Sequence, residues 1–111
     1  MNSDLKKKLR IKSGVVKRMN REHESYQREV DKDRDRVQKL RDNGASESEI
    51  KRQEEVLQET IAMIPYTRRK LNEAIQGLRD FMKENDTNND LIGSQEWTEA
   101  SNSLSAASVS V

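Results

Sequence analysis

The stretch EIKRQEEVLQETIAMIPYTRRKLNEAIQGLRDFM, residues 49–82, decides the fold of this chain. Its apolar residues recur at alternating steps of three and four, which places them on one stripe of a helix. The stripe consists of Ile50, Leu57, Ile61, Ile64, Leu71, Ile75, Leu78 and Met82, interrupted at the same spacing by Glu54 and Arg68. We therefore predict a long helix over about residues 46–84, the second of the chain, that buries one narrow face against a neighbour.

The only proline of the chain, Pro65, lies inside this run. Proline has no N–H and its ring crowds the carbonyl four residues earlier, which costs about 3 kcal/mol in a helix interior. The apolar stripe nevertheless keeps its phase from Ile61 to Leu71, a register that two separate helices would not need. We predict one continuous helix that is kinked at Pro65.

The residues before this helix carry another stripe with the same spacing. Its apolar and aromatic members are Leu5, Leu9, Val16, Met19, Tyr26, Val30, Val37 and Leu40, with Lys12, His23 and Asp33 at the remaining positions. Asn43-Gly44 suits the left-handed residue that ends a helix, and Ser46 with Glu49 has the spacing of a capping box. Because the connection is so short, the first helix, about residues 5–42, must lie antiparallel to the second.

A polar linker at residues 85–90 separates the second helix from a weaker stripe. That stripe begins after Ser94, a candidate N-cap, and consists of Trp97, Ala100, Leu104, Ala107 and Val111. The serines between these residues are poor helix formers. We predict a shorter third helix over about residues 95–108, held mainly by Trp97 and Leu104, and a flexible C-terminal tail.

Composition favours a thin bundle over a thick globular core. Charged residues make up 37% of the 111 residues, whereas hydrophobic residues reach 32% and aromatic residues 4%. A long rod needs only one narrow apolar stripe from each helix. The predicted fold class is all-α: an elongated antiparallel three-helix bundle that forms a single domain over residues 1–111.

The sequence offers no constellation of residues for catalysis or for a cofactor. Cysteine is absent and His23 is the only histidine, which excludes a thiol nucleophile and a zinc-thiolate site. Residues 86–90 look like the opening of a calcium loop, but Leu91 replaces its glycine and Trp97 its bidentate glutamate. We predict a protein that is not an enzyme and binds no metal, with His23 as a structural residue of the seam.

Charge is balanced overall, at a net +1, but residues 1–21 hold eight basic residues and one acid. Such a stretch attracts nucleic acid or an anionic membrane. No aromatic residue lies there to stack on bases or to anchor in lipid, so we favour a solvated face or a docking patch for an acidic protein. Without an apolar run of about 20 residues or a signal-peptide core, we expect a soluble cytoplasmic protein that binds neither nucleic acid nor membrane.

Three strings are more specific than a generic bundle requires. They are IKSGVVKR at residues 11–18, KRQEEVLQET at residues 51–60, and MIP at residues 63–65 followed by RRKL at residues 68–71. Their order and spacing resemble the tubulin-binding cofactor A family, in which an IKTGVVKRL-like string opens the first helix and KKQxEVLxES-like and MIP strings lie on the second. The likeness covers about residues 9–82 well and the remainder only loosely. Tyr66 and Thr67 depart from it, since the family usually has Asp-Cys after the proline.

The resemblance implies a chaperone that captures β-tubulin and passes it toward assembly with α-tubulin, in the cytoplasm and associated with the cytoskeleton. We expect one cluster of residues on the second helix and a basic pair across the bundle to border the contact surface. They are Ile64, Pro65, Tyr66, Arg68 and Arg69 on the second helix and Lys17 and Arg18 on the first. The alternative for Pro65 is that it only bends the helix around its neighbours.

Two other classes of protein stay open. The apolar seam also suits a coiled-coil adaptor or a self-associating scaffold, in which it would face another chain. The basic N-terminal stretch leaves a nucleic-acid-binding protein as a further rival. The sequence does not decide between a monomer and a homodimer.

Overall fold

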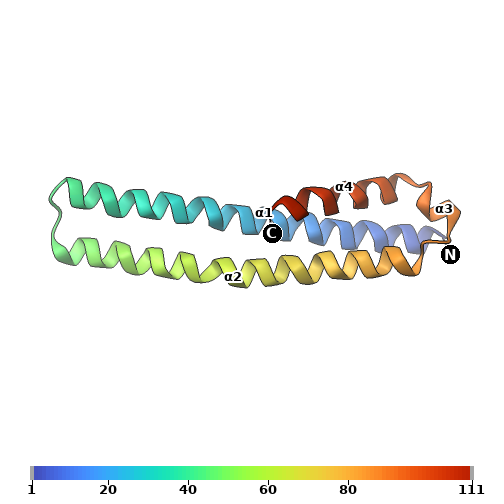
Figure 1. Ribbon diagram of the computed structural model, residues 1–111, viewed down its shortest axis with the longest axis horizontal. Coiled ribbons are helices and arrows are strands. Elements are labelled where there is room, and N and C mark those ends of the chain that lie inside the picture. Colours follow the sequence, from blue (N-terminus) through green and yellow to red (C-terminus); the bar gives the residue numbers. More distant parts are fainter. Residues whose placement is uncertain (1, 111) are drawn as a thin grey trace.

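The computed structural model describes residues 2–110, with side chains for residues 2–108. Four helices follow one another in the order α1 (Asn2–Asp42), α2 (Glu47–Glu84), α3 (Asn89–Ile92) and α4 (Gln95–Ser110). They form a rod 64 Å long and 18 Å across (Figure 1). The described residues contain no strand, so the all-α class is confirmed.

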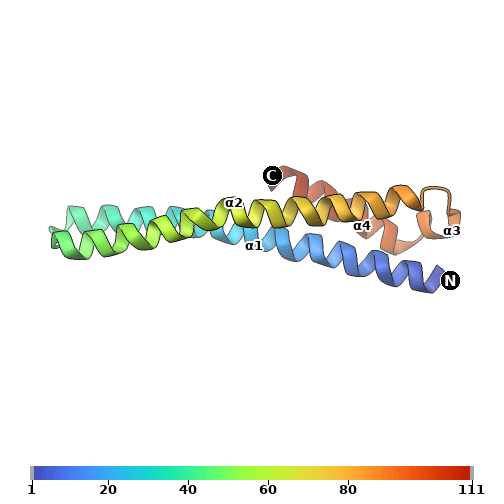
Figure 2. The same cartoon turned by 90° about the horizontal axis from the view of Figure 1, so that it is seen from below.

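The two long helices run antiparallel along the whole rod (Figures 1 and 2). The turn between them has the predicted chemistry. Gly44 has a φ of +70°, the left-handed conformation that glycine adopts without strain, and its N–H donates to the Arg41 carbonyl oxygen at 3.1 Å. Ser46 Oγ accepts from the Glu49 backbone N–H at 3.2 Å and so caps α2.

The predicted count of three helices is wrong, because the polar linker contains a helical turn of its own. Asn88 caps this turn: its side-chain oxygen accepts from the Leu91 backbone N–H at 3.1 Å. Leu91 is fully buried in the core and holds α3 in place. The Asn and Asp content of residues 85–90 predicts a loop, yet these residue types also cap helices, and one apolar side chain is enough to anchor a single turn.

α4 returns along the rod parallel to α1 and antiparallel to α2 (Figure 1), and it packs mainly on α1. Its deepest residues are small. Ala100, Ser103 and Ala107 are buried, and Ser103 Oγ lies 3.0 Å from Ser13 Oγ of α1. Trp97 and Leu104, the expected anchors, are only partly buried and pack against the edge of the core. The small side chains allow α4 to approach α1 closely.

α2 is continuous through Pro65, as its apolar register predicted. Ser94 caps α4, because its hydroxyl oxygen accepts from the Trp97 backbone N–H at 3.2 Å. The predicted flexible tail, residues 109–111, lies outside the residues whose side chains are described. None of the helices that the structure describes is long and apolar enough to cross a membrane.

The core predicts unequal costs for two matched substitutions in α2. Leu71 is fully buried, so Leu71→Ala should lower the free energy of unfolding by about 2–5 kcal/mol, as typical for a buried leucine. Leu57 occupies the same stripe two heptads earlier but is only partly buried, and Leu57→Ala should cost less than about half as much. Urea unfolding monitored by circular dichroism measures both. Equal costs would contradict this account of the core.

Candidate functional site

α4 covers only one half of the rod (Figure 1). Its middle lies beside Ser13 of α1, and near its end Ser108 Oγ accepts from Arg79 Nη2 of α2 at 3.3 Å. Farther along the rod, α1 and α2 pair with each other alone. We call residues 24–42 and 47–66 the open half, and the remainder of α1 and α2 the covered half.

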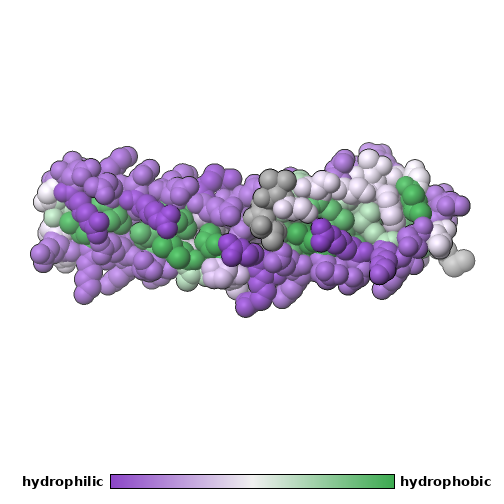
Figure 3. All heavy atoms as spheres, in the orientation of Figure 1, coloured by the Kyte–Doolittle hydropathy of each residue, from purple (hydrophilic) through white to green (hydrophobic). Residues whose placement is uncertain are grey.

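On α2, burial differs between the two halves, whereas α1 buries Val30, Asp33 and Val37 in the open half as well. All buried residues of α2 lie in the covered half, namely Thr67, Leu71, Ile75 and Leu78. The stripe residues of α2 in the open half, Ile50, Leu57, Ile61 and Ile64, are only partly buried. Figure 3 shows hydrophobic side chains at the surface between two hydrophilic ridges in the open half, and further hydrophobic side chains beside α4. A partner protein would gain free energy by covering this apolar strip.

Polar side chains close one edge of the open half. Asp33 is 1% exposed, and its carboxylate accepts from Thr60 Oγ1 at 2.7 Å and from Arg36 Nη1 at 2.5 Å. Arg36 Nη1 also donates to Glu29 Oε1 at 2.9 Å. The hydrogen bond with Glu29, followed by the one with Asp33, raises the pKa of Arg36 above its ordinary value. A buried carboxylate with two donors holds the two helices in register here.

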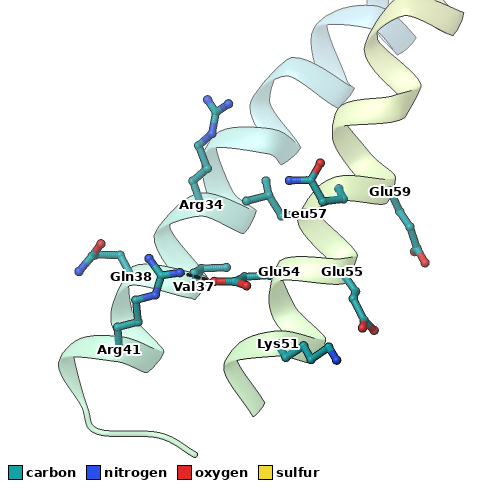
Figure 4. A pocket seen from close by; sticks show the side chains of 10 residues that line it. Arg34, Val37, Gln38, Arg41, Lys51, Glu54, Glu55, Leu57 and Glu59 are labelled. Carbon is teal, nitrogen blue, oxygen red and sulfur yellow. Dashed lines mark hydrogen bonds and ion pairs between the residues drawn. The ribbon is translucent and has the colours of Figure 1, made fainter. Parts of the chain in front are cut away.

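The other edge is an open groove of about 820 Å³. Val37 and Leu57 lie between the helices as its floor, and Arg41 pairs with Glu54 across it (Figure 4). Arg34 also lines it from α1. The groove and the polar network flank the seam on opposite sides. On α1, Glu29 and Arg36 each precede a seam valine (Val30 or Val37) by one residue, whereas Arg34 and Arg41 each follow one by four residues. In a paired helix these two offsets place side chains on opposite sides of the seam.

The predicted contact residues of α2 lie just beyond the inner end of this groove. Pro65, Arg68 and Arg69 are exposed and line one shallow hollow of about 420 Å³. Tyr66 is 41% exposed, and the cations of Arg69 and Lys70 lie 5.7 Å and 5.6 Å from its ring centroid. Ile64 differs from these residues because it faces the seam and is partly buried.

The basic pair of α1 lies elsewhere. Lys17 lines a separate hollow between α1 and α4, together with Asn20 and Glu99, and Arg18 is exposed beside it in the chain. The structure therefore brings Pro65, Arg68 and Arg69 together and leaves Lys17 in another hollow. Whether any of these seven residues contacts a partner stays a prediction.

A buried polar network at the middle of the rod was not expected from the sequence. His23 is fully buried, with its Nδ1 2.7 Å from Thr67 Oγ1 and its Nε2 3.3 Å from Gln27 Nε2. The Thr67 hydroxyl lies 2.9 Å from the Met63 carbonyl oxygen. A neutral His23 that donates through Nδ1 to Thr67 and accepts from Gln27 fits these contacts, with Thr67 donating to Met63. His23 is thus structural, as predicted, and its partner Thr67 occupies the seam of α2.

The described residues contain no group of three or more His, Asp or Glu side chains placed to hold a metal ion. The calcium-like string at residues 86–90 serves the fold instead. Asn88 caps α3, and the Asp90 carboxylate lies 3.8 Å from Lys6 Nζ. The groove is lined by the apolar side chains of Val37 and Leu57 and by charged side chains such as Arg34 and Lys51.

Comparison with known proteins identifies the family. The model of the family "Tubulin binding cofactor A" matches residues 4–104. The chain belongs to the tubulin binding cofactor A family. Tubulin-specific chaperone A of Homo sapiens is 35% identical over 94 residues, which cover 85% of this chain and 84% of the human protein. Tubulin-folding cofactor A of Arabidopsis thaliana is 34% identical over 76 residues, covering 68% and 67% of the two chains.

Solved structures of cofactor A proteins share the fold. The crystal structure of tubulin folding cofactor A from Arabidopsis thaliana matches with a TM-score of 0.86 at 25% identity, covering 96% of this chain and 98% of that one. Human tubulin chaperone cofactor A matches with a TM-score of 0.77 at 31% identity, covering 96% and 99%. The family resemblance seen in the three strings is therefore confirmed, and its relatives are named as chaperones or folding cofactors.

The polar network of the open half yields a stability prediction. Thr60→Val keeps the β-branched shape but removes a donor from the buried Asp33 carboxylate, so it should lower the free energy of unfolding by about 1.5–3 kcal/mol. Thr98→Val, at an exposed position of α4, is the matched control and should change it by less than about 0.5 kcal/mol. Chemical denaturation measures the free energy of unfolding of both variants. Equal effects would show that the hydrogen bond from Thr60 to Asp33 does not contribute to stability.

Proposed function

We propose that the protein is a tubulin-folding cofactor that binds β-tubulin and holds it for assembly with α-tubulin, without enzymatic activity. Membership of the cofactor A family supports tubulin as the partner. The observation that carries the proposal is the partly buried apolar seam of the open half, because a holding chaperone needs apolar surface that its own fold leaves uncovered. We expect the protein to act in the cytoplasm, in association with the cytoskeleton, and without a cofactor.

Charge supports the choice of an acidic partner. Of the N-terminal basic residues, Lys6 pairs with Asp90, and Lys12 Nζ lies 5.8 Å from the centroid of the Phe81 ring. These two cations therefore serve the fold. Lys17 and Arg18 are exposed and adjacent, and they are available to steer an acidic protein toward the rod.

We also infer that α2 bends at Pro65. Pro65 has no N–H for the Ile61 carbonyl, and the Thr67 hydroxyl bonds to the Met63 carbonyl oxygen four residues back. Both features are known to bend helices. Such a bend would lie where the covered half meets the open half and would set the angle between them.

Capture of purified β-tubulin by the immobilised chain, together with analytical ultracentrifugation, tests the proposed function. We expect a specific complex with β-tubulin and no higher assemblies of the chain alone. The alternative is a self-associating scaffold, which the partly buried seam also favours. If the chain forms tetramers or filaments and does not bind β-tubulin, that result would contradict our proposal and support the alternative.

Reversal of two exposed charges should slow the encounter. The double variant Lys17→Glu, Arg18→Glu should lower the association rate for β-tubulin about tenfold at low salt, since steering accelerates association by this order or more. Because exposed charges are screened, the difference should fade as ionic strength rises. Stopped-flow kinetics across a salt series measures it. The double reversal Lys32→Glu, Lys39→Glu, at two exposed positions of α1, changes the net charge by the same amount and is the control. An equal loss of association rate in this control would show that Lys17 and Arg18 have no specific role in steering.

Replacing the proline separates a structural role from a functional one. Pro65→Ala restores a backbone donor and a good helix former, so it should raise the free energy of unfolding by up to about 3 kcal/mol. If the bend shapes the binding surface, the same variant should capture β-tubulin less tightly. Thermal unfolding and titration with β-tubulin report the two effects. Unchanged affinity for β-tubulin in a more stable variant would mean that Pro65 affects the structure of α2 but not the binding of β-tubulin.

A further inference from the structure

We propose that the groove of the open half binds an amphipathic helix of the client protein, in the place where an extension of α4 would lie. The inference rests on the proposed function, because it assigns the contact surface for β-tubulin. It goes beyond that function by naming the groove and the kind of segment that fills it.

Residues spaced by seven on α1 show that the groove lies on the side where α4 packs. Ser13 bonds to Ser103 of α4, and Asn20, seven residues later, lines the hollow between α1 and α4. Arg34 and Arg41, which lie two and three heptads after Asn20, line the groove. Positions seven apart occupy one side of a paired helix, so α4 and the groove share this side of α1.

The same spacing holds on α2. Arg79 bonds to Ser108 of α4, and positions three and four heptads earlier are Gln58 and Lys51, which line the groove. The furrow between α1 and α2 therefore holds a helix in the covered half and stands open beyond it. Figure 3 shows this open part as the apolar strip on the face that also carries α4. A furrow that accepts one helix has the width and apolar floor to accept another.

α4 indicates the chemistry of the expected occupant. Its buried face is made of Ala100, Ser103 and Ala107, and its Glu99 lines a hollow together with the basic residues Lys17 and Arg21. In the groove, Arg34 occupies a position comparable to that of Lys17 and Arg21 beside α4. The groove residues Glu55 and Glu59 point away from α1 (Figure 4). We expect a client helix with small residues at steps of three and four and an acidic residue beside Arg34.

A second copy of this chain fits the groove poorly. The outer faces of α1 and α2 in the open half carry long polar side chains such as Lys32, Lys39 and Arg52, which are exposed. Among the described helices, only α4 presents a stripe of small residues, and that stripe is already buried against α1. Complementarity therefore favours a helix supplied by another protein.

Site-directed photocrosslinking tests the groove directly, because the chain has no cysteine of its own. Gln58→Cys places a thiol on the groove side of α2. Lys32→Cys is the matched control: it is also exposed in the same half, on the side of α1 that carries Glu29 and Arg36. Each variant is labelled with benzophenone maleimide, mixed with purified β-tubulin and irradiated. We expect at least tenfold more adduct from position 58, mapped by mass spectrometry to a helix with a small-residue stripe.

Every outcome decides the inference. Loss of β-tubulin capture on labelling at position 58, but not at position 32, also supports the groove as the contact. Equal adduct at both positions, or no adduct at position 58 while the labelled protein still captures β-tubulin, would overturn the groove and leave the proposed function intact. Adduct only between two copies of the chain would make the groove a self-association surface. An unlabelled chain that does not bind β-tubulin at all would overturn the proposed function and this inference together.

Discussion

The packing of α4 against one half of the paired long helices is the interaction on which the rest of the structure depends. At about 1.5 Å per residue, the 16 residues of α4 span about 24 Å, whereas the 38 residues of α2 span about 57 Å. Two paired helices each bury one stripe, but a third element is needed to close the seam between them. The hydrophobic core, with Leu71 and Leu78 at its centre, therefore gathers where α4 lies, and the remainder of the rod is a two-helix hairpin with one open side.

The hairpin needs other means of holding its register, and polar groups supply them. The pair Asp33 and Thr60, which is partly buried, and the pair His23 and Thr67, which is buried, link α1 to α2 at and beyond the point where α4 ends. Buried polar groups favour one register of two helices, because any slip leaves them without partners. The apolar residues beside them, Leu57 and Ile61, are then free to serve as binding surface as well as seam.

Much of this arrangement follows from sequence periodicity, and the remainder does not for physical reasons. The steps of three and four, Gly44 and the Ser46 cap were enough to predict two long antiparallel helices. The composition of residues 85–90 predicts a polar linker and not the turn of α3, because a single buried Leu91 fixes that turn through tertiary packing, which local propensity does not report. The partners of Asp33 and His23 lie 27 and 44 residues away, so no local pattern could pair them. The groove could not be predicted either, since it depends on which part of the paired helices α4 packs against and not on which residues line it.

Hydrogen–deuterium exchange of the free chain and of its complex with β-tubulin tests the central claim most directly. The account predicts that binding slows amide exchange in residues 24–42 and 47–66, where no third helix covers the seam, and leaves the already protected covered half nearly unchanged. Slowed exchange confined to α4 and the covered half, with the open half unaffected, would contradict it.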